Sequence, residues 1–370
     1  MAKRLQHQLL SQRALNRALL ARQHLLQRVH GSVLGLIDEL IGMQAQAPNP
    51  PYFGLWSRLH NFAQQQLSDL FEQRQVVRIA LLRSTIHLVS ASDCLNLRPL
   101  LQPVLERGFQ SNFGKQLPGI DKPAVIEYGR RLVEAQPQTF QALGSLLHER
   151  WPDYPAAALA QALRTWLALV QVPPRGLWAT SGPAAHTTAE HWLGRPLATM
   201  PDLAQLVRRY LAVFGPASIN DMQAWSGLTR LSVVFKQLQA ELVCFCDEQG
   251  RELYDLVHAP RPDPETPAPP RLLAEFDNIL LAHADRSRIL SETYRQRLFT
   301  SNGLIPGAIL VDGFVVGMWK IKQPESSLHL QLFEPIAKAE RQALEHEAAS
   351  LLHFATNTNE PIIRFEEPSA

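Results

Sequence analysis

Residues 202–257 have the sequence DLAQLVRRYLAVFGPASINDMQAWSGLTRLSVVFKQLQAELVCFCDEQGRELYDLV. Apolar residues recur with helical spacing in the first part, and Gly215-Pro216 then interrupts the pattern. Ser218 is suited to cap a second helix and Gly227 to end it, because a serine hydroxyl accepts from free helical N–H groups and glycine adopts positive φ. The predicted helices cover residues 202–214, 218–227 and 229–240.

The end of the same segment alternates between apolar and polar residues. The alternation covers residues 241–246 and 252–257, and Asp247-Glu248-Gln249-Gly250 between them has the composition of a hairpin loop. Two helices, a turn, a third helix and a hairpin occur in this order in winged helix-turn-helix units. We therefore predict such a unit at residues 201–257.

Two other parts of the chain repeat this architecture without repeating its sequence. The weaker copy has predicted helices at 139–150 and 156–171, followed by strand and turn residues 172–178. The N-terminal part has predicted helices near 9–29, 32–43, 52–60 and 66–73, then strands at 78–82 and 85–90. Arg83-Ser84 between these strands is expected to form a short wing.

Proline density marks the sharpest break in the chain. Residues 258–270 contain six prolines, which exclude regular structure and predict a linker or a long exposed loop. Beyond it, strands are predicted at 305–311 and 314–321 around Asp312-Gly313, a dipeptide suited to a type I′ hairpin turn. A strand at 328–333 and a helix at 336–354 are predicted to follow.

The expected fold class is α+β, mainly helical, with tandem winged helix-turn-helix units and a C-terminal β-rich α+β part. The first unit is expected to end near residue 95, and connecting helices with the second unit to end near residue 200. The expected divisions are residues 1–95, 96–200, 201–257, 258–270 and 271–370.

Charge along the chain is nearly balanced. The 370 residues are 46% hydrophobic and carry a formal net charge of +2, so no whole-molecule field demands an anionic partner. The first acidic residue is Asp38, and the basic residues that precede it are Lys3, Arg4, Arg13, Arg17, Arg22 and Arg28. This segment is interpreted as a solvated helix face or as a surface that faces phosphates.

The basic segment also imitates a transit peptide, but its leucine spacing continues into the next predicted helix, so we assign it to the folded domain. No apolar run reaches the roughly 18 residues that a membrane-spanning helix needs, and no secretory leader is recognisable. We therefore expect a soluble, cytoplasmic protein without a membrane partner.

The usual catalytic signatures are absent from the sequence. It lacks the P-loop, dinucleotide-binding, zinc-protease and nucleophile-elbow motifs, which disfavours nucleotide, hydride and zinc-protease chemistry. His186 and His191 are five residues apart, which on a helix separates them by about 140° and disfavours a shared metal ion. Cys94, Cys244 and Cys246 are interpreted as ordinary thiols. We predict no metal and no cofactor.

A short polar segment follows the second predicted helix, with the sequence Gly42-Met43-Gln44-Ala45-Gln46-Ala47-Pro48-Asn49-Pro50-Pro51. Its prolines prevent the helix from continuing. In an extended chain Gln44 and Gln46 point to the same side, whereas on a helix they diverge by about 200°. Two converging amides offer acceptors and donors enough to hold and orient a water molecule without a titrating base. The alternative is an ordinary polar helix exit.

This segment resembles the AlkZ-type winged-helix DNA glycosylases. The resemblance also includes residues 50–56 (PPYFGLW), 83–89 (RSTIHLV), 276–278 (FDN), 283–288 (HADRSR) and 310–313 (LVDG), so it spans most of the chain. It implies tandem winged-helix units and a β-rich part around a concave, basic channel for duplex DNA. Members excise N7-alkylated purines, and some unhook interstrand crosslinks.

The resemblance also implies which residues carry the chemistry. The family's catalytic motif is glutamine, an aliphatic residue, then glutamine or aspartate, and Gln44-Ala45-Gln46 matches the double-glutamine form of the crosslink-resistance branch. An N7-alkylated purine is positively charged, so its departure needs no strong general acid, while the sugar gains oxocarbenium character. Gln44 and Gln46 are assigned jointly to water placement and oxocarbenium stabilisation, and whether the base is flipped out is left open.

We expect monofunctional hydrolysis that leaves an abasic site, because none of the lysines adjoins the glutamine motif in the sequence. The expected partner is duplex DNA that contains alkylated purines, bound by a monomer in the cytoplasm at the bacterial nucleoid. The rival hypothesis is a winged-helix transcriptional regulator without catalytic activity, since winged helices most often belong to regulators.

Candidate DNA contacts are basic residues that lie in the resembling segments or on a predicted wing. They are Arg83, His87, Arg286, Arg288 and Lys320. Two structural alternatives stay open. Arg286 and Arg288 are also suited to ion pairs with Asp277 or Asp285, and a histidine on an apolar strand such as His87 is often a core residue.

Overall fold

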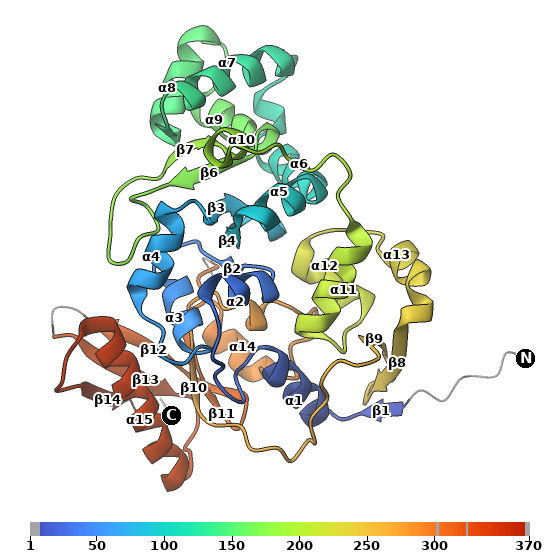
Figure 1. Cartoon of the computed structure of the whole chain (residues 1–370), viewed down its shortest axis with the longest axis vertical. Helices are drawn as coiled ribbons and strands as arrows, with labels where there is room; N and C mark the ends of the chain where they lie inside the picture. The colour runs from blue at the N-terminus through green and yellow to red at the C-terminus, as the bar shows by residue number, and fades with distance from the viewer. Residues whose placement is uncertain (1–7, 301–302, 323–324, 367–370) are drawn as a thin grey trace, which may run out of the picture.

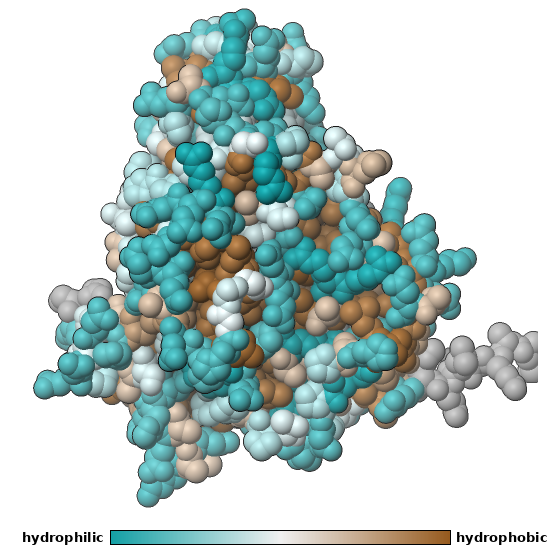
Figure 2. All heavy atoms as spheres, viewed as in Figure 1, coloured by the Kyte–Doolittle hydropathy of each residue, from teal (hydrophilic) through white to brown (hydrophobic). Residues whose placement is uncertain are grey.

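The computed structural model describes residues 8–300, 303–322 and 325–366. The green, yellow and red parts of the chain form lobes around a blue centre, which contains α2 (Val33–Glu39), β2 (Met43–Gln44) and α3 (Pro50–Trp56) (Figure 1). On the face drawn in Figure 2, hydrophobic residues are visible in a hollow at this centre, and hydrophilic residues surround it. The predicted catalytic segment thus lies where the lobes meet.

Residues 202–257 have the predicted order of elements. The helices are α11 (Leu203–Phe214), α12 (Ile219–Ser226) and α13 (Ser232–Gln237), and the hairpin is β8 (Leu242–Asp247) with β9 (Glu252–Leu256). Ser218 caps α12 in a capping box with Asp221, and Gly227 ends it at φ 79°. The third helix is shorter than predicted because Arg230 has a left-handed backbone, φ 60°, which delays the start of the helix.

The first and second candidate units share one sheet, in the order β2-β4-β3-β6-β7-β5. Its strands are β3 (Val76–Ala80), β4 (Ile86–Ser90), β5 (Gln138–Thr139), β6 (Leu169–Val172) and β7 (Ala185–Thr188), besides β2. Strands β3 and β6 pair at Arg78 and Gln171, across the predicted boundary at residue 95. The predicted helix 156–171 is therefore too long: α9 (Ala156–Trp166) ends early, because the following residues are buried as a strand between β3 and β7.

A helical lobe stands on this sheet and has its own hydrophobic core. It contains α7 (Lys122–Ala135), α8 (Phe140–Arg150) and α9, packed through Val125, Val133, Leu143 and Leu163. The helices α5 (Ala91–Leu100), α6 (Gln102–Asn112) and α10 (Ala189–Leu193) connect the lobe to the rest of the chain. Of these, α5 begins before the expected boundary at residue 95.

The C-terminal part is the predicted β-rich α+β unit. Its sheet has the order β10-β11-β12-β13-β14. The strands are β10 (Arg271–Leu273), β11 (Gly307–Val311), β12 (Phe314–Lys322), β13 (Ser327–Leu332) and β14 (Ile362–Glu366), and α15 (Lys338–Thr356) packs on them. Asp312 and Gly313 turn the β11–β12 hairpin with φ 46° and 83°, as a type I′ turn requires. The first strand was missed because three residues give too short a period to recognise.

The basic N-terminal segment does not form the surface that was predicted. The helix α1 (Gln12–Arg22) ends well before residue 29, since His24 turns the chain with φ 54°. Arg17 is completely buried and pairs with Asp312, and buried Arg22 holds Asp255 through two hydrogen bonds of 2.8 Å. Both interpretations, a solvated face and a phosphate-facing surface, are therefore wrong for these two arginines. Lys3 and Arg4 lie outside the described residues.

The proline-rich segment 258–270 is a loop and not a free linker. The carbonyl oxygen of Thr266 accepts from Arg17 Nε at 2.6 Å, and that of Pro260 accepts from Arg22 Nε at 3.1 Å. One hydrophobic core continues across it, joining Leu19 and Leu20 to Leu273 and Leu310.

Within the described ranges, no helix is long and apolar enough to span a membrane.

Candidate active site

The strand β2 brings the glutamine motif to the edge of the shared sheet. Met43 lies opposite Leu88, and Gln44 lies opposite His87, in an antiparallel pair with β4. Gly42 lets the chain change from helix to strand at φ 80°, where a β carbon would lie 2.5 Å from Val89 Cγ1. Of the two conformations considered for this segment, the extended one is thus present at Gln44.

Gln44 is buried and its amide is oriented by a cation. Its side chain is 7% exposed, and its Oε1 accepts from Arg83 Nη2 at 2.9 Å. Arg83 also donates to the carbonyl oxygen of Trp225, and its backbone is held at φ 53°. A guanidinium only donates, so Gln44 must direct its oxygen to Arg83, which leaves its Nε2 group free to face elsewhere. Burial, with the nearby charge of Arg286, lowers the pKa of Arg83 to about 10.

Gln46 is exposed and its side chain makes a hydrogen bond to a strand of the sheet. Its Oε1 accepts from the backbone N–H of Ile86 at 2.7 Å, beside the bond of 2.8 Å from Ala45 N to Ile86 O. Buried Arg78 donates to the carbonyl oxygen of Ala45 at 2.5 Å, so the middle of the motif is also held by an arginine. The carbonyl oxygens of both glutamine side chains therefore accept from fixed donors in the protein.

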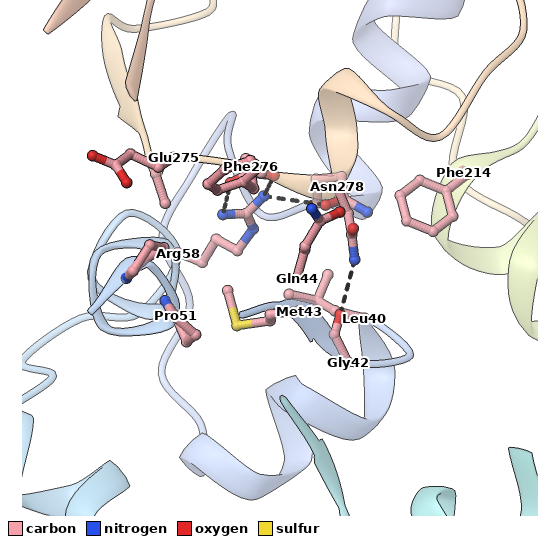
Figure 3. A pocket seen from close by; sticks show the side chains of 14 residues that line it. Leu40, Gly42, Met43, Gln44, Pro51, Arg58, Phe214, Glu275, Phe276 and Asn278 are labelled. Carbon is pink, nitrogen blue, oxygen red and sulfur yellow. Dashed lines mark hydrogen bonds and ion pairs between the residues drawn. The ribbon is translucent and has the colours of Figure 1, made fainter. Parts of the chain in front are cut away.

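A pocket of about 310 Å³ opens beside Gln44. Its walls come from segments far apart in the sequence, as Figure 3 shows: residues 40–44, the start of α3, Phe214 at the end of α11, and residues 274–278. Gln44 lines this pocket and Gln46 is outside its lining. The structure therefore does not bring the two amides into one pocket, although they lie two residues apart.

Residues 277–278 lock the far wall of the pocket. Asp277 accepts two hydrogen bonds of 2.9 Å from Arg58, and both side chains are almost completely buried. Asn278 donates to the carbonyl oxygen of Gly42 at 3.2 Å, and its Oδ1 lies 3.5 Å from Arg83 Nη2. The 276–278 segment thereby clamps the chain immediately before Gln44.

Two larger pockets adjoin this one. A pocket of about 1050 Å³ is lined by residues 47–50, Trp178, Glu275 and Lys320, among others, and one of about 760 Å³ by Phe276, Trp319, Lys320 and Gln331, among others. Glu275 lines all three pockets. It is accessible to solvent, yet enough protein surrounds it for burial to raise its pKa.

The candidate DNA contacts occupy different environments. His87 is fully buried, its Nδ1 lies 3.0 Å from the carbonyl oxygen of Thr85, and burial lowers its pKa to about 3. Arg288 is buried and donates to the carbonyl oxygen of Pro216 at 2.7 Å. Neither side chain can reach a phosphate from such a position, so we withdraw both as DNA contacts.

The remaining candidates differ in how far they reach solvent. Arg83 belongs to the support of Gln44, as described above. Arg286 is partly exposed and stacks over Phe299 at 5.0 Å, and Lys320 is exposed and lines the two larger pockets. Their contact with DNA stays a prediction.

No direct ion pair joins Arg286 or Arg288 to Asp277 or Asp285 in the described residues, although the charge of Asp285 acts on buried Arg288. Asp277 is engaged by Arg58, and Asp285 pairs with Arg251. In the described part of the chain, no group of three or more histidine, cysteine or acidic side chains is arranged to bind a metal. His186, from the other candidate motif, is buried and stacks on Phe140 at 4.0 Å between ring centroids.

Sequence reasoning missed most of the residues that surround Gln44. Arg58, Arg78 and Glu275 carry no local signal, since an isolated arginine or glutamate is usually a surface residue. One usable signal for Asp277 and Asn278 is that they lie in the 276–278 segment that contributed to the family resemblance. A second usable signal is that Asp277 and Asn278 follow closely after a short apolar run, where site residues often lie.

The fold of this chain is similar to that of a solved DNA glycosylase structure. The solved structure of Streptomyces sahachiroi DNA glycosylase AlkZ matches with a TM-score of 0.79 and 20% identity, covering 96% of this chain and 100% of that one. At this level of identity the likeness establishes the fold, which confirms the predicted α+β class.

The family follows from sequence. A family model described as DNA glycosylase AlkZ-like matches residues 37–354. An interstrand DNA cross-link repair glycosylase from Streptomyces sahachiroi is 26% identical over 375 residues, covering 92% of this chain and 95% of its own. The chain belongs to the AlkZ-like DNA glycosylase family, which confirms the predicted resemblance. Its class is that of a DNA glycosylase, and the regulator hypothesis is not supported.

Proposed function

We propose that this protein is a monofunctional DNA glycosylase that hydrolyses the N-glycosidic bond of N7-alkylated purines in duplex DNA. The observation that carries the proposal is the buried Gln44 amide, fixed by Arg83 at the wall of a pocket between lobes. A rigid amide there suits the task that remains when the leaving group is already cationic, namely to position water against the sugar.

The orientation of the amides refines the expected chemistry. Each Oε1 already accepts one hydrogen bond, from Arg83 in Gln44 and from Ile86 N in Gln46. A carbonyl oxygen has two lone pairs, so each keeps one for water or for the developing positive charge on the sugar. Because protein donors fix these oxygens before substrate arrives, little reorganisation is needed in the transition state. We assign Gln44 to the pocket and Gln46 to the exposed edge of the sheet, outside the lining of that pocket.

Interstrand crosslinks are a second proposed substrate. The relative from Streptomyces sahachiroi is named for their repair. In this chain the pocket beside Gln44 shares Pro50 and Glu275 with a neighbouring pocket of about 1050 Å³, so a bulky adduct has room beyond the purine. An open site of this kind is compatible with a base that is too large to be flipped into a closed cavity.

Lys320 and Arg286 are the proposed contacts to phosphates, and the proposed binding form is a monomer. Lys320 also bears on the reaction type, since it lines the pocket next to residues 47–50. It does not line the pocket of Gln44, so we expect hydrolysis without a covalent intermediate. Trapping of a protein–DNA adduct by borohydride, lost in Lys320→Ala, would overturn the monofunctional assignment. The cytoplasm, at the bacterial nucleoid, is the proposed location because the proposed substrate is there.

The test is single-turnover incubation with a duplex that contains one N7-methylguanine, followed by alkaline cleavage of abasic sites. Wild type is expected to produce strand breaks, and Gln44→Ala/Gln46→Ala few. Gln136→Ala, an exposed glutamine at the end of α7, is the control and is expected to match wild type. If wild type cuts neither this duplex nor one with an N7-linked interstrand crosslink, the proposed function is wrong and a DNA-holding role takes its place.

A further inference from the structure

The pocket beside Gln44 is lined by two carboxylates of different character. Asp277 is neutralised by Arg58 through two hydrogen bonds of 2.9 Å, and it also accepts from the backbone N–H of Ile279 at 3.1 Å. Glu275, two residues earlier, takes part in no hydrogen bond or ion pair with the described residues. It is therefore the pocket's one uncompensated negative charge in the part of the chain that the structure describes.

Glu275 is held in this position by the backbone. The strand β10 ends at Leu273, and Phe276 then adopts φ 57° and donates its N–H to the carbonyl oxygen of Ile305 at 3.2 Å. The ring of Phe276 is buried, whereas Glu275 remains accessible at the junction of the three pockets. Figure 3 shows the Glu275 carboxylate on the side of Arg58 and Pro51, with Gln44 and Asn278 on the opposite side.

Two buried cations lie beside the glutamine motif, so a negative charge in the same pocket affects whether a cationic base can enter. Arg83 and Arg78 are buried, and each donates to the motif, to Gln44 Oε1 and to the carbonyl oxygen of Ala45. The ion pairs of the described residues do not include either of them, so their charges are not cancelled locally. A cationic base that enters beside two uncompensated guanidinium groups is repelled unless a negative group faces it.

We propose that Glu275 is the specificity-determining residue that recognises the positive charge of an N7-alkylated purine. This inference rests on the proposed function and adds a residue to it. Because Glu275 and Gln44 lie on different sides of the pocket, the purine lies toward Glu275 in this proposal when the sugar lies beside Gln44. The charge of the lesion is on the purine in the bound ground state and leaves it as the bond breaks, so Glu275 strengthens binding of the lesion more than it accelerates the reaction.

The environment of the side chain fits this role. Surrounding protein raises the pKa of Glu275, which means that its negative charge lacks full solvation before a ligand arrives. A cationic purine supplies the missing partner, whereas a neutral undamaged purine does not.

The experiment compares Glu275→Gln with wild type on matched cationic and neutral duplexes. Excision of N7-methylguanine is measured at increasing enzyme concentration under single turnover, which separates the half-saturating concentration from the maximal rate. Binding is measured on a duplex with 7-methyl-7-deazaguanine, which has the same shape without the charge. Glu149→Gln removes the same charge from an exposed position on α8 and is the control.

We expect Glu275→Gln to raise the half-saturating concentration for N7-methylguanine roughly tenfold, which corresponds to about 1.4 kcal/mol. The Kd for the neutral duplex is expected to stay within about twofold of wild type. The maximal rate is expected to stay equal or to rise, because the ground-state attraction that the substitution removes is partly lost in the transition state. Glu275→Asp, which keeps the charge, is expected to retain part of the preference. Melting temperatures equal to that of wild type exclude misfolding as the cause.

Four results would overturn the inference. An equal loss on cationic and neutral duplexes shows that Glu275 supports the shape of the pocket and not charge recognition. A reduced maximal rate at an unchanged half-saturating concentration assigns it to the sugar. An unchanged half-saturating concentration removes it from the site while the wild-type activity leaves the proposed function intact. If wild type itself leaves N7-methylguanine in place, the proposed function fails and this inference falls with it.

Discussion

Replacing Arg83 with methionine tests how the site is organised. Arg83 Nη2 donates to Gln44 Oε1 at 2.9 Å, and Gln44 is 7% exposed, so water cannot easily replace the lost donor. A hydrogen bond that involves a charged group is worth about 1.5 to 3 kcal/mol. If this energy keeps the amide in its reactive orientation, Arg83→Met lowers the single-turnover rate on N7-methylguanine duplex by roughly 10 to 150-fold.

The effect of Arg83 must also depend on Gln44, because Arg83 acts through it. We therefore expect Arg83→Met to lower the rate by no more than about twofold when it is introduced into Gln44→Ala. The control is Arg107→Met, since Arg107 also donates to a backbone carbonyl near α12, that of Gly227, and it is exposed. A loss of equal size in both backgrounds would refute the reasoning and assign Arg83 to folding or DNA binding.

Three further predictions follow from contacts in the structure. Arg58→Met is expected to lower the free energy of unfolding by about 3 to 5 kcal/mol, because it leaves the buried Asp277 charge unpaired. The double variant Arg58→Met/Asp277→Asn is expected to recover part of this loss. Chemical denaturation that shows additive losses for the two substitutions would contradict the prediction. Burial favours the neutral form of Asp312, but two arginines of α1 outweigh it and lower its pKa below 3.8. The stabilisation from ionised Asp312 is therefore present above pH 3.8 and is lost as the pH falls through the lower pKa of the folded state. Asp312→Asn should make the melting temperature fall less steeply with decreasing pH in the acid range. An unchanged dependence of the melting temperature on pH would count against the ion pair. Lys320→Ala should reduce the salt slope of DNA binding by roughly one, whereas Arg288→Met should lower the melting temperature and leave the slope unchanged, and the reverse pattern would restore Arg288 as a DNA contact.

Part of this molecule is legible from short stretches of sequence. The α11–β9 segment was predicted because Ser218, Gly227 and the alternating hairpin encode their own boundaries. The turn at Asp312-Gly313 was predicted for the same reason. Caps, turns and periodicity depend on residues within one or two helical turns, so they survive in a one-dimensional pattern.

Other predictions failed where the structure of one segment depends on contacts with a segment far away in the sequence. Residues 169–172 continue an apolar run after α9, and nothing local says that this run becomes the strand between β3 and β7. The arginines of α1 were assigned to solvent because arginine is usually exposed, yet Arg17 meets Asp312, 295 residues away. An isolated arginine has the same appearance in a sequence whether or not the fold brings it a carboxylate.

The candidate site divides in the same way. The sequence determined by itself that the prolines after Gln44 and Gln46 stop the helix from continuing, and family resemblance gave the two glutamines a role. Only the tertiary structure brought Arg83 to Gln44 from 39 residues away, Arg58 to Asp277 across 219 residues, and Glu275 to the junction of three pockets. Local conformation is set by neighbours in the chain, whereas the charge and shape of a pocket are set by which distant segments pack together.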